Sequence, residues 1–386
     1  MEPSQNLTPQ EQPVAIDTMP NKISIGLPAC DTARDRRFPL TPEGVEILVD
    51  AGYVVNIEKE AAKAIHYGDD AYTKRGAVVT DRLTTLHSDV IISIGRLSTL
   101  DLGCVSRGAA LLTLSDAIDK NNIENVLDRK LTTVFLDHIR DRHGNYPVAD
   151  LLSEIDGRAA MMKANELLAD DCHGKGILIG GVSGVTPCET VILGGGIAAI
   201  AAAESAVGLG SIVRIFDNDV FGLNKAECVM NGKACELFPH PKVLKTALRT
   251  ADIIIVASDS MAWNEVGVLK SGVVVVDISN KPGHVFPQLP IADLLATDRL
   301  FKNEGQVCYI NAGKTVPRTV AMAFGSAIQP IFRRIMREGK DLADAIISRK
   351  ELKPAVATFA GRVTCRDLAE RTGHSEVDIN IFLNLS

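Results

Sequence analysis

A glycine-rich turn between an apolar run and an alanine-rich segment is the feature that most constrains this chain. The apolar run TVIL (190–193) leads directly into GGGIAA (194–199). This order fits G-x-G-x-x-G/A at the junction of a strand and a helix. Gly194 permits a tight turn, Gly196 lets the backbone approach a pyrophosphate, and Ala199 allows close packing of the helix on the strand. The N-terminus of the helix presents N–H groups and a positive dipole end to the phosphates.

An acidic residue at the end of the next apolar run supports this interpretation. IVRIFD ends at Asp217, 21 residues after Gly196. A carboxylate at this spacing accepts hydrogen bonds from a ribose 2′-hydroxyl and repels a 2′-phosphate. The turn and the acid together predict NAD rather than NADP. The alternative is a glycine-rich turn that binds no ligand, but strand, glycines, helix and spaced acid together favour the dinucleotide.

Short apolar runs alternate with amphipathic segments along most of the chain. Such runs with helices between them predict parallel sheets that are buried on both faces. One α/β unit is expected over residues 21–147 and a second over 148–317. Residues 318–386 read as mostly helical and are expected to pack on the first unit, which makes that unit discontinuous. The expected strands are Lys22–Leu27, Tyr53–Glu58, Asp89–Gly95, Ala109–Leu114, Leu131–Leu136, Thr190–Gly196, Ile212–Asp217, Asp252–Ala257, Gly272–Ile278 and Gln306–Ile310.

Composition excludes several other classes of protein. The 386 residues are 46% hydrophobic and 23% charged, as in a folded chain of about two domains. The net charge of −7 without a basic run disfavours nucleic acid and membrane surfaces. Eight scattered cysteines without a CxxC pair predict reduced thiols in the cytoplasm, and no metal-ligand spacing is present. Residues 1–20 lack a secretory pattern and are expected to be a disordered tail.

Several blocks of the sequence resemble one family, the alanine dehydrogenases together with the alpha domain of proton-translocating transhydrogenases. The resemblance implies two doubly wound, Rossmann-like α/β domains, with an NAD-binding domain inserted in a discontinuous substrate domain and a cleft between them. It also implies a homo-oligomer, a dimer or a hexamer, and a small carboxylate-bearing substrate. The blocks are ARDRRFPLTPEGVEILVDAGYVVNIEKEA, LSEIDGRAAM, GKGILIGGVSGV, VILGGGIAAIAAAESAVGLGSIVRIFDND, VVDIS and INAGKTVPRT.

The resemblance assigns roles to particular residues. Arg37 stands where alanine dehydrogenases hold the substrate carboxylate, and a guanidinium offers that group a bidentate fork. The alternative is a surface arginine within RDRR. Ser153 matches a serine near the nicotinamide, and its alternative is a helix N-cap with Asp156 in the capping-box position. The other positions that match cofactor-binding segments are Gly194, Gly196, Ile197, Ala198, Asp217, Ser258, Asp259, Ile278, Asn280 and Asn311.

Three positions depart from the alanine dehydrogenases. Gly95, next to Arg96, replaces a substrate-binding lysine, Asp116 replaces a catalytic histidine, and Lys281 replaces an aspartate of the nicotinamide loop. We expect Arg96 to assist Arg37 in holding substrate, and Lys281 with Asp116 to move protons at the α nitrogen or oxygen. The alternative is that Asp116 and Lys281 form a structural ion pair and that alanine turnover is lost.

Three functions follow from these observations. The first is an NAD-dependent oxidoreductase of the amino-acid dehydrogenase or imine reductase type (EC 1.4.1). It would transfer hydride between the nicotinamide and an amino acid, imino acid or 2-oxo acid other than plain alanine. The second is a transhydrogenase-alpha-like domain that needs a partner. The third is an NAD-binding protein that kept the cofactor site and lost the chemistry.

Overall fold

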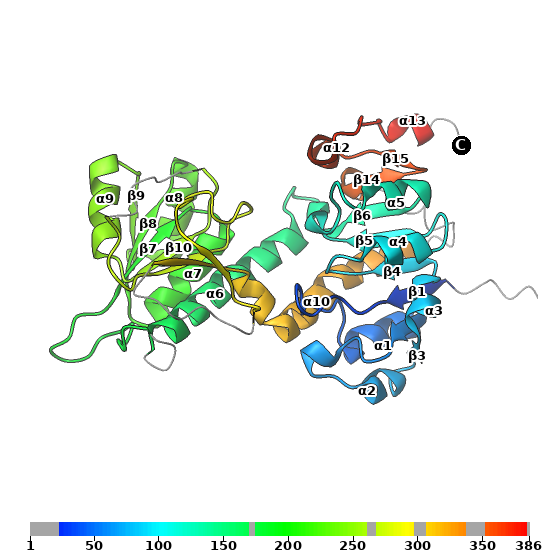
Figure 1. The fold of residues 1–386 in the computed structure, drawn as a ribbon, viewed down its shortest axis with the longest axis horizontal. Coiled ribbons are helices and arrows are strands. Elements are labelled where there is room, and N and C mark those ends of the chain that lie inside the picture. Colours follow the sequence, from blue (N-terminus) through cyan, green and yellow to red (C-terminus); the bar gives the residue numbers. More distant parts are fainter. Residues whose placement is uncertain (1–22, 170–173, 261–267, 297–305, 337–351, 384–386) are drawn as a thin grey trace, which may run out of the picture.

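Two sheets, each covered by helices on both faces, form the two lobes of the chain (Figure 1). The structure, a computed structural model, describes residues 23–169, 174–260, 268–296, 306–336 and 352–383. The tail expected over residues 1–20 lies outside these ranges. One lobe takes strands from both ends of the described chain, and the other takes strands only from its middle. The expected fold class, with one lobe built from a discontinuous stretch of chain, is confirmed.

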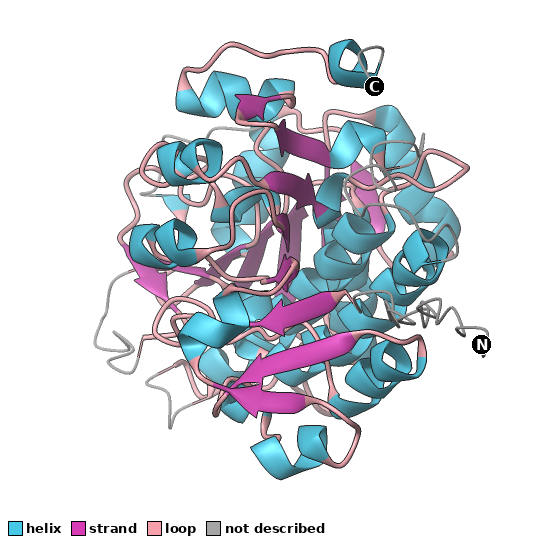
Figure 2. Cartoon of the chain, turned by 90° about the vertical axis from the view of Figure 1, so that its right-hand side faces the viewer, coloured by secondary structure: helices cyan, strands magenta, loops and turns pink. Residues whose placement is uncertain are grey.

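The first sheet has eight strands in the order β15-β14-β6-β5-β4-β1-β2-β3. Figure 2 faces this lobe, where the strands run between helices on either side. The pairs among β1 to β6 are parallel, whereas β14 is antiparallel to both β6 and β15. The strands are β1 (Ser24–Leu27), β2 (Val54–Glu58), β3 (Val78–Thr80), β4 (Val90–Ile92), β5 (Ala110–Thr113), β6 (Thr132–Phe135), β14 (Val356–Phe359) and β15 (Arg362–Val363).

The described part of residues 318–386 is mostly helical, as expected, but it also holds two short strands that were not expected. Thr358 on β14 is buried, and its hydroxyl donates to the carbonyl oxygen of Leu131 at 2.9 Å and lies 2.8 Å from the hydroxyl of Thr133. These bonds fix β14 to the edge of the sheet beside β6. The segment therefore packs on the first lobe, as expected, but partly as strands.

The second sheet has seven parallel strands in the order β12-β13-β11-β10-β7-β8-β9. Its strand order reverses between β7 and β10, and ligands of such sheets bind at this point, outside the carboxyl ends of the strands. The strands are β7 (Glu189–Leu193), β8 (Ile212–Phe216), β9 (Cys235–Leu237), β10 (Ile253–Val256), β11 (Val274–Asp277), β12 (Ile291–Asp293) and β13 (Val307–Ile310).

Helices connect the strands of both sheets. Helix α1 begins with a capped turn, since the Thr41 hydroxyl accepts a hydrogen bond from the Gly44 N–H and Pro42 occupies the first turn. None of the described helices is long and apolar enough to cross a membrane. The α-helices are α1 (Pro42–Asp50), α2 (Asp69–Thr73), α3 (Arg82–Leu86), α4 (Thr99–Cys104), α5 (Ile123–Asp128), α6 (Pro147–Leu168), α7 (Ile197–Gly208), α8 (Val220–Met230), α9 (Pro241–Thr250), α10 (Pro317–Met336), α12 (Arg366–Thr372) and α13 (Asn380–Leu383).

The apolar runs of the sequence are continuous because both faces of each sheet are buried. In β4, Val90 and Ile92 pack in the core on one face, and Ile91 packs in the core on the other. All three side chains are almost completely buried. Each sheet therefore has two cores, and its polar groups gather at the strand ends.

Helix α6 joins the lobes and brings polar groups between them. Its first half contributes Val148 and Ile155 to the core of the first lobe, and its second half, which includes Met161, packs in the core of the second. A side chain at Gly157 would stand 2.1 Å from the carbonyl oxygen of Ala198, so glycine lets α6 and α7 touch. Helix α6 begins before Ser153, so Ser153 lies inside the helix and the N-cap alternative is wrong.

Candidate active site

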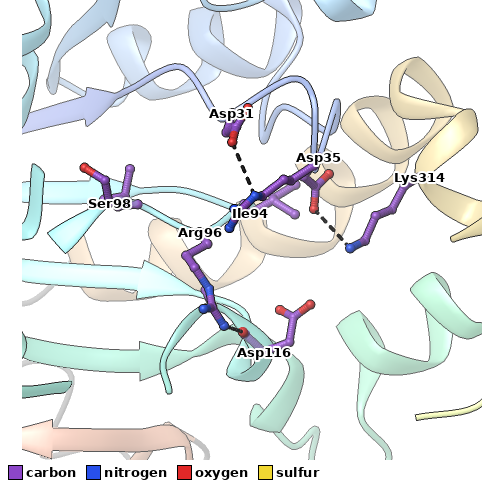
Figure 3. Close-up of a pocket in the computed structure, with 11 residues that line it drawn as sticks. Asp31, Asp35, Ile94, Arg96, Ser98, Asp116 and Lys314 are labelled. Atoms are coloured by element: carbon purple, nitrogen blue, oxygen red, sulfur yellow. Dashed lines mark hydrogen bonds and ion pairs between the residues drawn. The ribbon is translucent and has the colours of Figure 1, made fainter. Parts of the chain in front are cut away.

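Two adjoining hollows lie where the two lobes of the fold meet. The inner cavity, of about 370 Å³, has walls from both sheets and from α6. The second hollow, of about 300 Å³, opens beside β4 and the turn before α4. We call this hollow the outer lobe, and it is distinct from the two lobes of the fold. Asp116 and Lys314 line both hollows and mark the place where they meet. Figure 3 shows these two side chains on opposite sides of the outer lobe.

The inner cavity is built from residues that follow strand ends. Ser115 and Asp116 follow β5, Asp137 follows β6, and Asn311 follows β13. Ile278, Ser279, Asn280 and Pro282 follow β11. The carboxyl ends of the strands in both sheets therefore face the same space, which is where open α/β sheets bind ligands. Ser153 and Asp156 complete the wall from α6.

Arg37 is held in a buried ion pair with Asp35. Its Nε donates to Asp35 Oδ1 at 2.9 Å, and its Nη2 donates to Asp35 Oδ2 at 2.6 Å. Burial alone lowers the pKa of Arg37, but the hydrogen bonds and charge of Asp35 outweigh it and raise that pKa, so the guanidinium stays charged. The side chain lines the inner cavity, which excludes the surface-arginine alternative.

Lys314 brings a second cation to the cavity. It lies in a 3-10 turn, η6 (Ala312–Thr315), directly after Asn311, and its Nζ is 3.9 Å from Asp35 Oδ2. Figure 3 shows the ammonium pointing toward Asp35 at the edge of the outer lobe. Asp35 thus faces both cations, and although burial raises its pKa, the bonds from Arg37 and the charge of Lys314 leave that pKa below its usual value.

Asp156 is a carboxyl group poised to exchange a proton. Burial raises its pKa to about 6, against the charges of Arg37 and Lys314 and a hydrogen bond from the Gly313 N–H, which lower it. A side chain at position 313 would collide with Asp156 Oδ1, so glycine lets the carboxyl approach the backbone. A carboxyl with a pKa near neutrality, beside two cations in a cavity, suits general acid–base work.

The turn that carries Asp116 is fixed by side chains. Arg371 on α12 donates to the carbonyl oxygens of Ser115 and Ile118, at 3.1 Å and 3.0 Å, and Arg96 donates to that of Asp116 at 3.2 Å. Asp137 accepts from the N–H and hydroxyl of Ser115, and its burial raises the pKa of this carboxyl. The backbone of this turn is therefore fixed, and the Asp116 side chain that it carries lines both hollows.

Arg96 lies in the outer lobe rather than in the inner cavity. Its Nη1 donates to Asp119 Oδ2 at 2.6 Å, and Nη2 donates to the Asp116 carbonyl. Gly95 beside it is packed tightly, because a Cβ there would stand 2.8 Å from the sulfur of Cys30 and 3.4 Å from Asp35. A lysine does not fit at position 95 without a shift of its neighbours.

The structure does not bring Lys281 to the cavity. Ile278, Ser279, Asn280 and Pro282 line the inner wall, but Lys281 is exposed and lines neither hollow. Its backbone N–H donates to Asp259 Oδ1 at 3.0 Å, which fixes this part of the turn. The lysine that shares the cavity with Asp116 is therefore Lys314, and this corrects the expected pairing of Asp116 with Lys281.

The glycine-rich turn has the geometry that a pyrophosphate needs. Gly194 has φ +127°, and a Cβ there would stand 3.1 Å from the backbone of Ala257. Gly196 precedes α7, and a Cβ at Gly196 would meet nothing within 4 Å, so space remains before the helix N-terminus that begins at Ile197. Ala198 follows in the first turn of that helix.

The predicted ribose acid stands at the end of β8. Asp217 Oδ2 accepts a hydrogen bond from the Gly195 N–H, and Oδ1 accepts one from the Asp219 N–H at 2.7 Å. Ser258 and Asp259 follow β10, beside the glycine-rich turn, since Ser258 Cβ lies 3.1 Å from the Cβ position of Gly194. These residues share the strand-end region where the adenosine half is expected.

The remaining predicted cofactor residues line the inner cavity. Ser153, Ile278, Asn280 and Asn311 all contribute to its wall. Asn311 has φ 65°, and its side-chain amide donates to Asp293 Oδ2 at 2.9 Å. The hydroxyl of Ser279 is buried and has no hydrogen-bond partner within the described ranges.

Sequence reasoning missed several residues of this site. Asp35, Asp137, Asp156 and Lys314 were not predicted to be functional, although Asp35 and Lys314 lie within the blocks ARDRR and INAGKTVPRT. The only available signal was an ionisable residue inside a block already matched to the site. Among the described residues, no group of His, Cys, Asp and Glu side chains could hold a metal ion.

Family models match nearly the whole described chain. The model of the alanine dehydrogenase/PNT N-terminal domain matches residues 26–156, and that of the C-terminal domain matches residues 160–366. The chain belongs to the alanine dehydrogenase/PNT family. Alanine dehydrogenase of Staphylococcus saprophyticus is 27% identical over 369 residues, which cover 92% of this chain and 98% of that protein. Alanine dehydrogenase 2 of Staphylococcus aureus is 27% identical over 362 residues, covering 90% and 96%.

Solved structures show the same fold for this family member. An L-alanine dehydrogenase superposes with a TM-score of 0.80 at 24% identity, covering 94% of this chain and all of that one. The transhydrogenase from Sinorhizobium meliloti gives a TM-score of 0.73 at 17% identity, covering 88% of this chain and 99% of that one. At these identities the likeness establishes the fold, and the chemistry has to be argued from the site.

Proposed function

We propose that this chain is an NAD-dependent oxidoreductase that acts on an amino acid, imino acid or 2-oxo acid other than plain alanine. The observation that carries the proposal is the inner cavity itself. It places two cations, Arg37 and Lys314, and two carboxyl groups, Asp116 and Asp156, against the strand ends of a dinucleotide-binding sheet. Its relatives include alanine dehydrogenases, which supports this class of substrate.

The residues present fit a bound NAD molecule. A pyrophosphate suits the open space before α7 and the tight turn at Gly194, and a ribose suits the carboxylate of Asp217. The unpartnered hydroxyl of Ser279 suits a polar group at the nicotinamide end of the cofactor. Residues that would hold the nicotinamide half are Ser153, Ile278, Asn280 and Asn311. When bound, the nicotinamide supplies or accepts the hydride.

Each charged residue of the inner cavity binds a different group of the substrate. Arg37 has its Nε and Nη2 engaged by Asp35, so its remaining Nη1 donors and the Lys314 ammonium bind the α-carboxylate. Asp116 receives the α-ammonium at the fixed turn. Asp156, with a pKa raised by burial to about 6, holds and releases the proton at the α nitrogen or oxygen.

The proposal is tested in the oxidative direction. The chain is mixed with NAD and a panel of L-amino acids, and the absorbance of NADH at 340 nm is followed as a function of pH. We expect activity that rises as Asp156 loses its proton near pH 6, with L-alanine a poor substrate. Tight binding of NADH without turnover of any amino or 2-oxo acid would instead select the non-catalytic NAD-binding protein.

The assembly and location of the protein are part of the same proposal. We propose a homo-oligomer in the cytoplasm. Light scattering of the purified chain measures the first, and fractionation of cells measures the second.

A further inference from the structure

We propose that the outer lobe binds the distal carboxylate of a dicarboxylic amino acid or 2-oxo acid whose α-carbon lies in the inner cavity. This inference rests on the proposed function and names the substrate class of the same site. The outer lobe adjoins the inner cavity, because Asp116 and Lys314 line both. Its volume of about 300 Å³ approaches the inner cavity's, and the methyl group of alanine would leave most of it unfilled.

Arg96 provides a fixed cation with unused donors in this lobe. Asp119 and the Asp116 carbonyl hold one hydrogen of Nη1 and one of Nη2, so the guanidinium plane is set before a ligand arrives. The Nε hydrogen and the second hydrogens of Nη1 and Nη2 have no partner within the described ranges. An oriented guanidinium with free hydrogens is suited to a carboxylate.

Two further cations border the same space. Arg34 Nε lies 3.6 Å from Asp31 Oδ2 at an exposed position, and neither Nη group of Arg34 makes a hydrogen bond among the described residues. The Lys314 ammonium has only the 3.9 Å approach to Asp35 there. Figure 3 shows Arg96 and Lys314 on two sides of the lobe.

Asp35 and Asp31, two acidic side chains of the outer lobe, already accept hydrogen bonds from neighbouring groups. Asp35 accepts the backbone N–H of Arg37 and three contacts from its guanidinium. Asp31 accepts the Ala33 N–H at 3.1 Å. Away from Asp116, which stands at the junction with the inner cavity, the outer lobe therefore has donors in excess, and donors in excess select an acceptor-rich, anionic group rather than an ammonium.

Asp116, at the junction of the two hollows, determines the orientation of the bound substrate. Its carboxylate has no hydrogen bond within the described ranges and stands between the hollows, where it suits an ammonium group. The α-carboxylate then lies toward Arg37, the α-ammonium at Asp116, and the distal carboxylate toward Arg96. This order matches an amino-dicarboxylic acid.

Three amino acids of equal length test the proposal. L-glutamate, L-norvaline and L-ornithine differ only in the distal group, and each is titrated calorimetrically into the NAD-loaded chain. We expect L-glutamate to bind at least about tenfold more tightly than L-norvaline, because charge-assisted hydrogen bonds are gained. L-ornithine should bind most weakly. Equal affinity for L-glutamate and L-norvaline, or tightest binding of L-ornithine, overturns the proposal.

Arginine variants locate the effect. Arg34→Gln should weaken the binding of L-glutamate by roughly fivefold and leave the affinity for L-norvaline unchanged, since the substitution removes donors only at the outer lobe. Arg96→Gln should weaken L-glutamate more than L-norvaline. Arg107→Gln is the matched control, because Arg107 is exposed before the opposite end of β5 and should alter neither affinity. An equal loss for both ligands in Arg34→Gln refutes the assignment.

Absorbance at 340 nm in the same samples separates this inference from the proposed function. Preferential binding of L-glutamate with no reduction of NAD would support a carboxylate site in the outer lobe and contradict the proposed hydride transfer. Reduction of NAD by L-glutamate and L-norvaline with equal efficiency and equal affinity would support the proposed hydride transfer and contradict a carboxylate site in the outer lobe.

Discussion

The ammonium of Lys314 lies 3.9 Å from Oδ2 of Asp35, the same oxygen that accepts Nη2 of Arg37 at 2.6 Å. One buried carboxylate thus orients both cations of the inner cavity. Arg37 follows β1 of the first sheet, whereas Lys314 follows β13 of the second, so the two cations meet only where the two lobes of the fold join.

Lys314→Met should impair substrate binding without affecting NADH affinity. The variant removes a cation from the proposed carboxylate site, so KM should rise roughly 10- to 100-fold. Lys281→Met is the matched control and should change KM less than about twofold, because Lys281 is exposed and lines neither hollow. Steady-state kinetics measure both, and a larger effect of Lys281→Met would contradict the geometry.

Asp35→Asn should destabilise the folded chain. It leaves the Arg37 guanidinium buried beside a neutral partner, and breaking a buried ion pair costs about 3–5 kcal/mol. The double variant Asp35→Asn with Arg37→Met should lose less free energy of unfolding than the sum of the single losses. Urea unfolding measures all three, and simple additivity would show that the two side chains do not interact.

Asp156 should make the free energy of unfolding depend on pH. Its folded pKa of about 6 exceeds the unfolded value of about 3.9, so the folded state binds the proton more tightly. Stability from this group is therefore greatest below about pH 4 and falls until about pH 6, by at most about 3 kcal/mol. Asp156→Asn should flatten this part of the profile.

Urea unfolding between pH 4 and pH 7 checks the Asp156 prediction. The difference between wild type and Asp156→Asn isolates one group, because the other titrations are common to both. A difference that does not vary with pH would show that the Asp156 pKa is not raised.

Gly195→Ala should weaken NADH binding by more than about tenfold. A Cβ at Gly195 would stand 2.9 Å from the backbone of Gly222 and 3.0 Å from Asp217 Oδ2, so the turn or the acid must shift. Gly208→Ala is the control, because a Cβ there meets nothing within 4 Å. Quenching of the single tryptophan or calorimetry with NADH measures the affinities, and similar values for the two variants would contradict a pyrophosphate site at this turn.

The sequence predicted those parts of the fold that are set by local pattern. Each of the ten expected apolar runs contains a strand, because burial on both faces leaves a continuous apolar signal. Short strands such as β9 and β12 were missed, since three residues carry little periodicity. The antiparallel strand β14 was missed because it depends on bonds between Thr358 and a strand far away in sequence.

The site was predictable only where its residues follow a local motif. The glycine turn and Asp217 have a fixed spacing on neighbouring elements. Lys314 and Asp156 meet through tertiary packing, which no spacing encodes. Lys281 stands between Asn280 and Pro282, which line the cavity, and the orientation of a turn decides which of three neighbours faces inward.

The central claim is that the inner cavity carries out NAD-dependent hydride transfer on a carboxylate-bearing substrate. Its most direct test is the absorbance of NADH at 340 nm after the wild-type chain is mixed with NADH, ammonium and a series of 2-oxo acids. The account predicts loss of absorbance with at least one acid, slowed at least about tenfold at subsaturating acid in Lys314→Met. Saturated NADH binding with unchanged absorbance for every acid would contradict it.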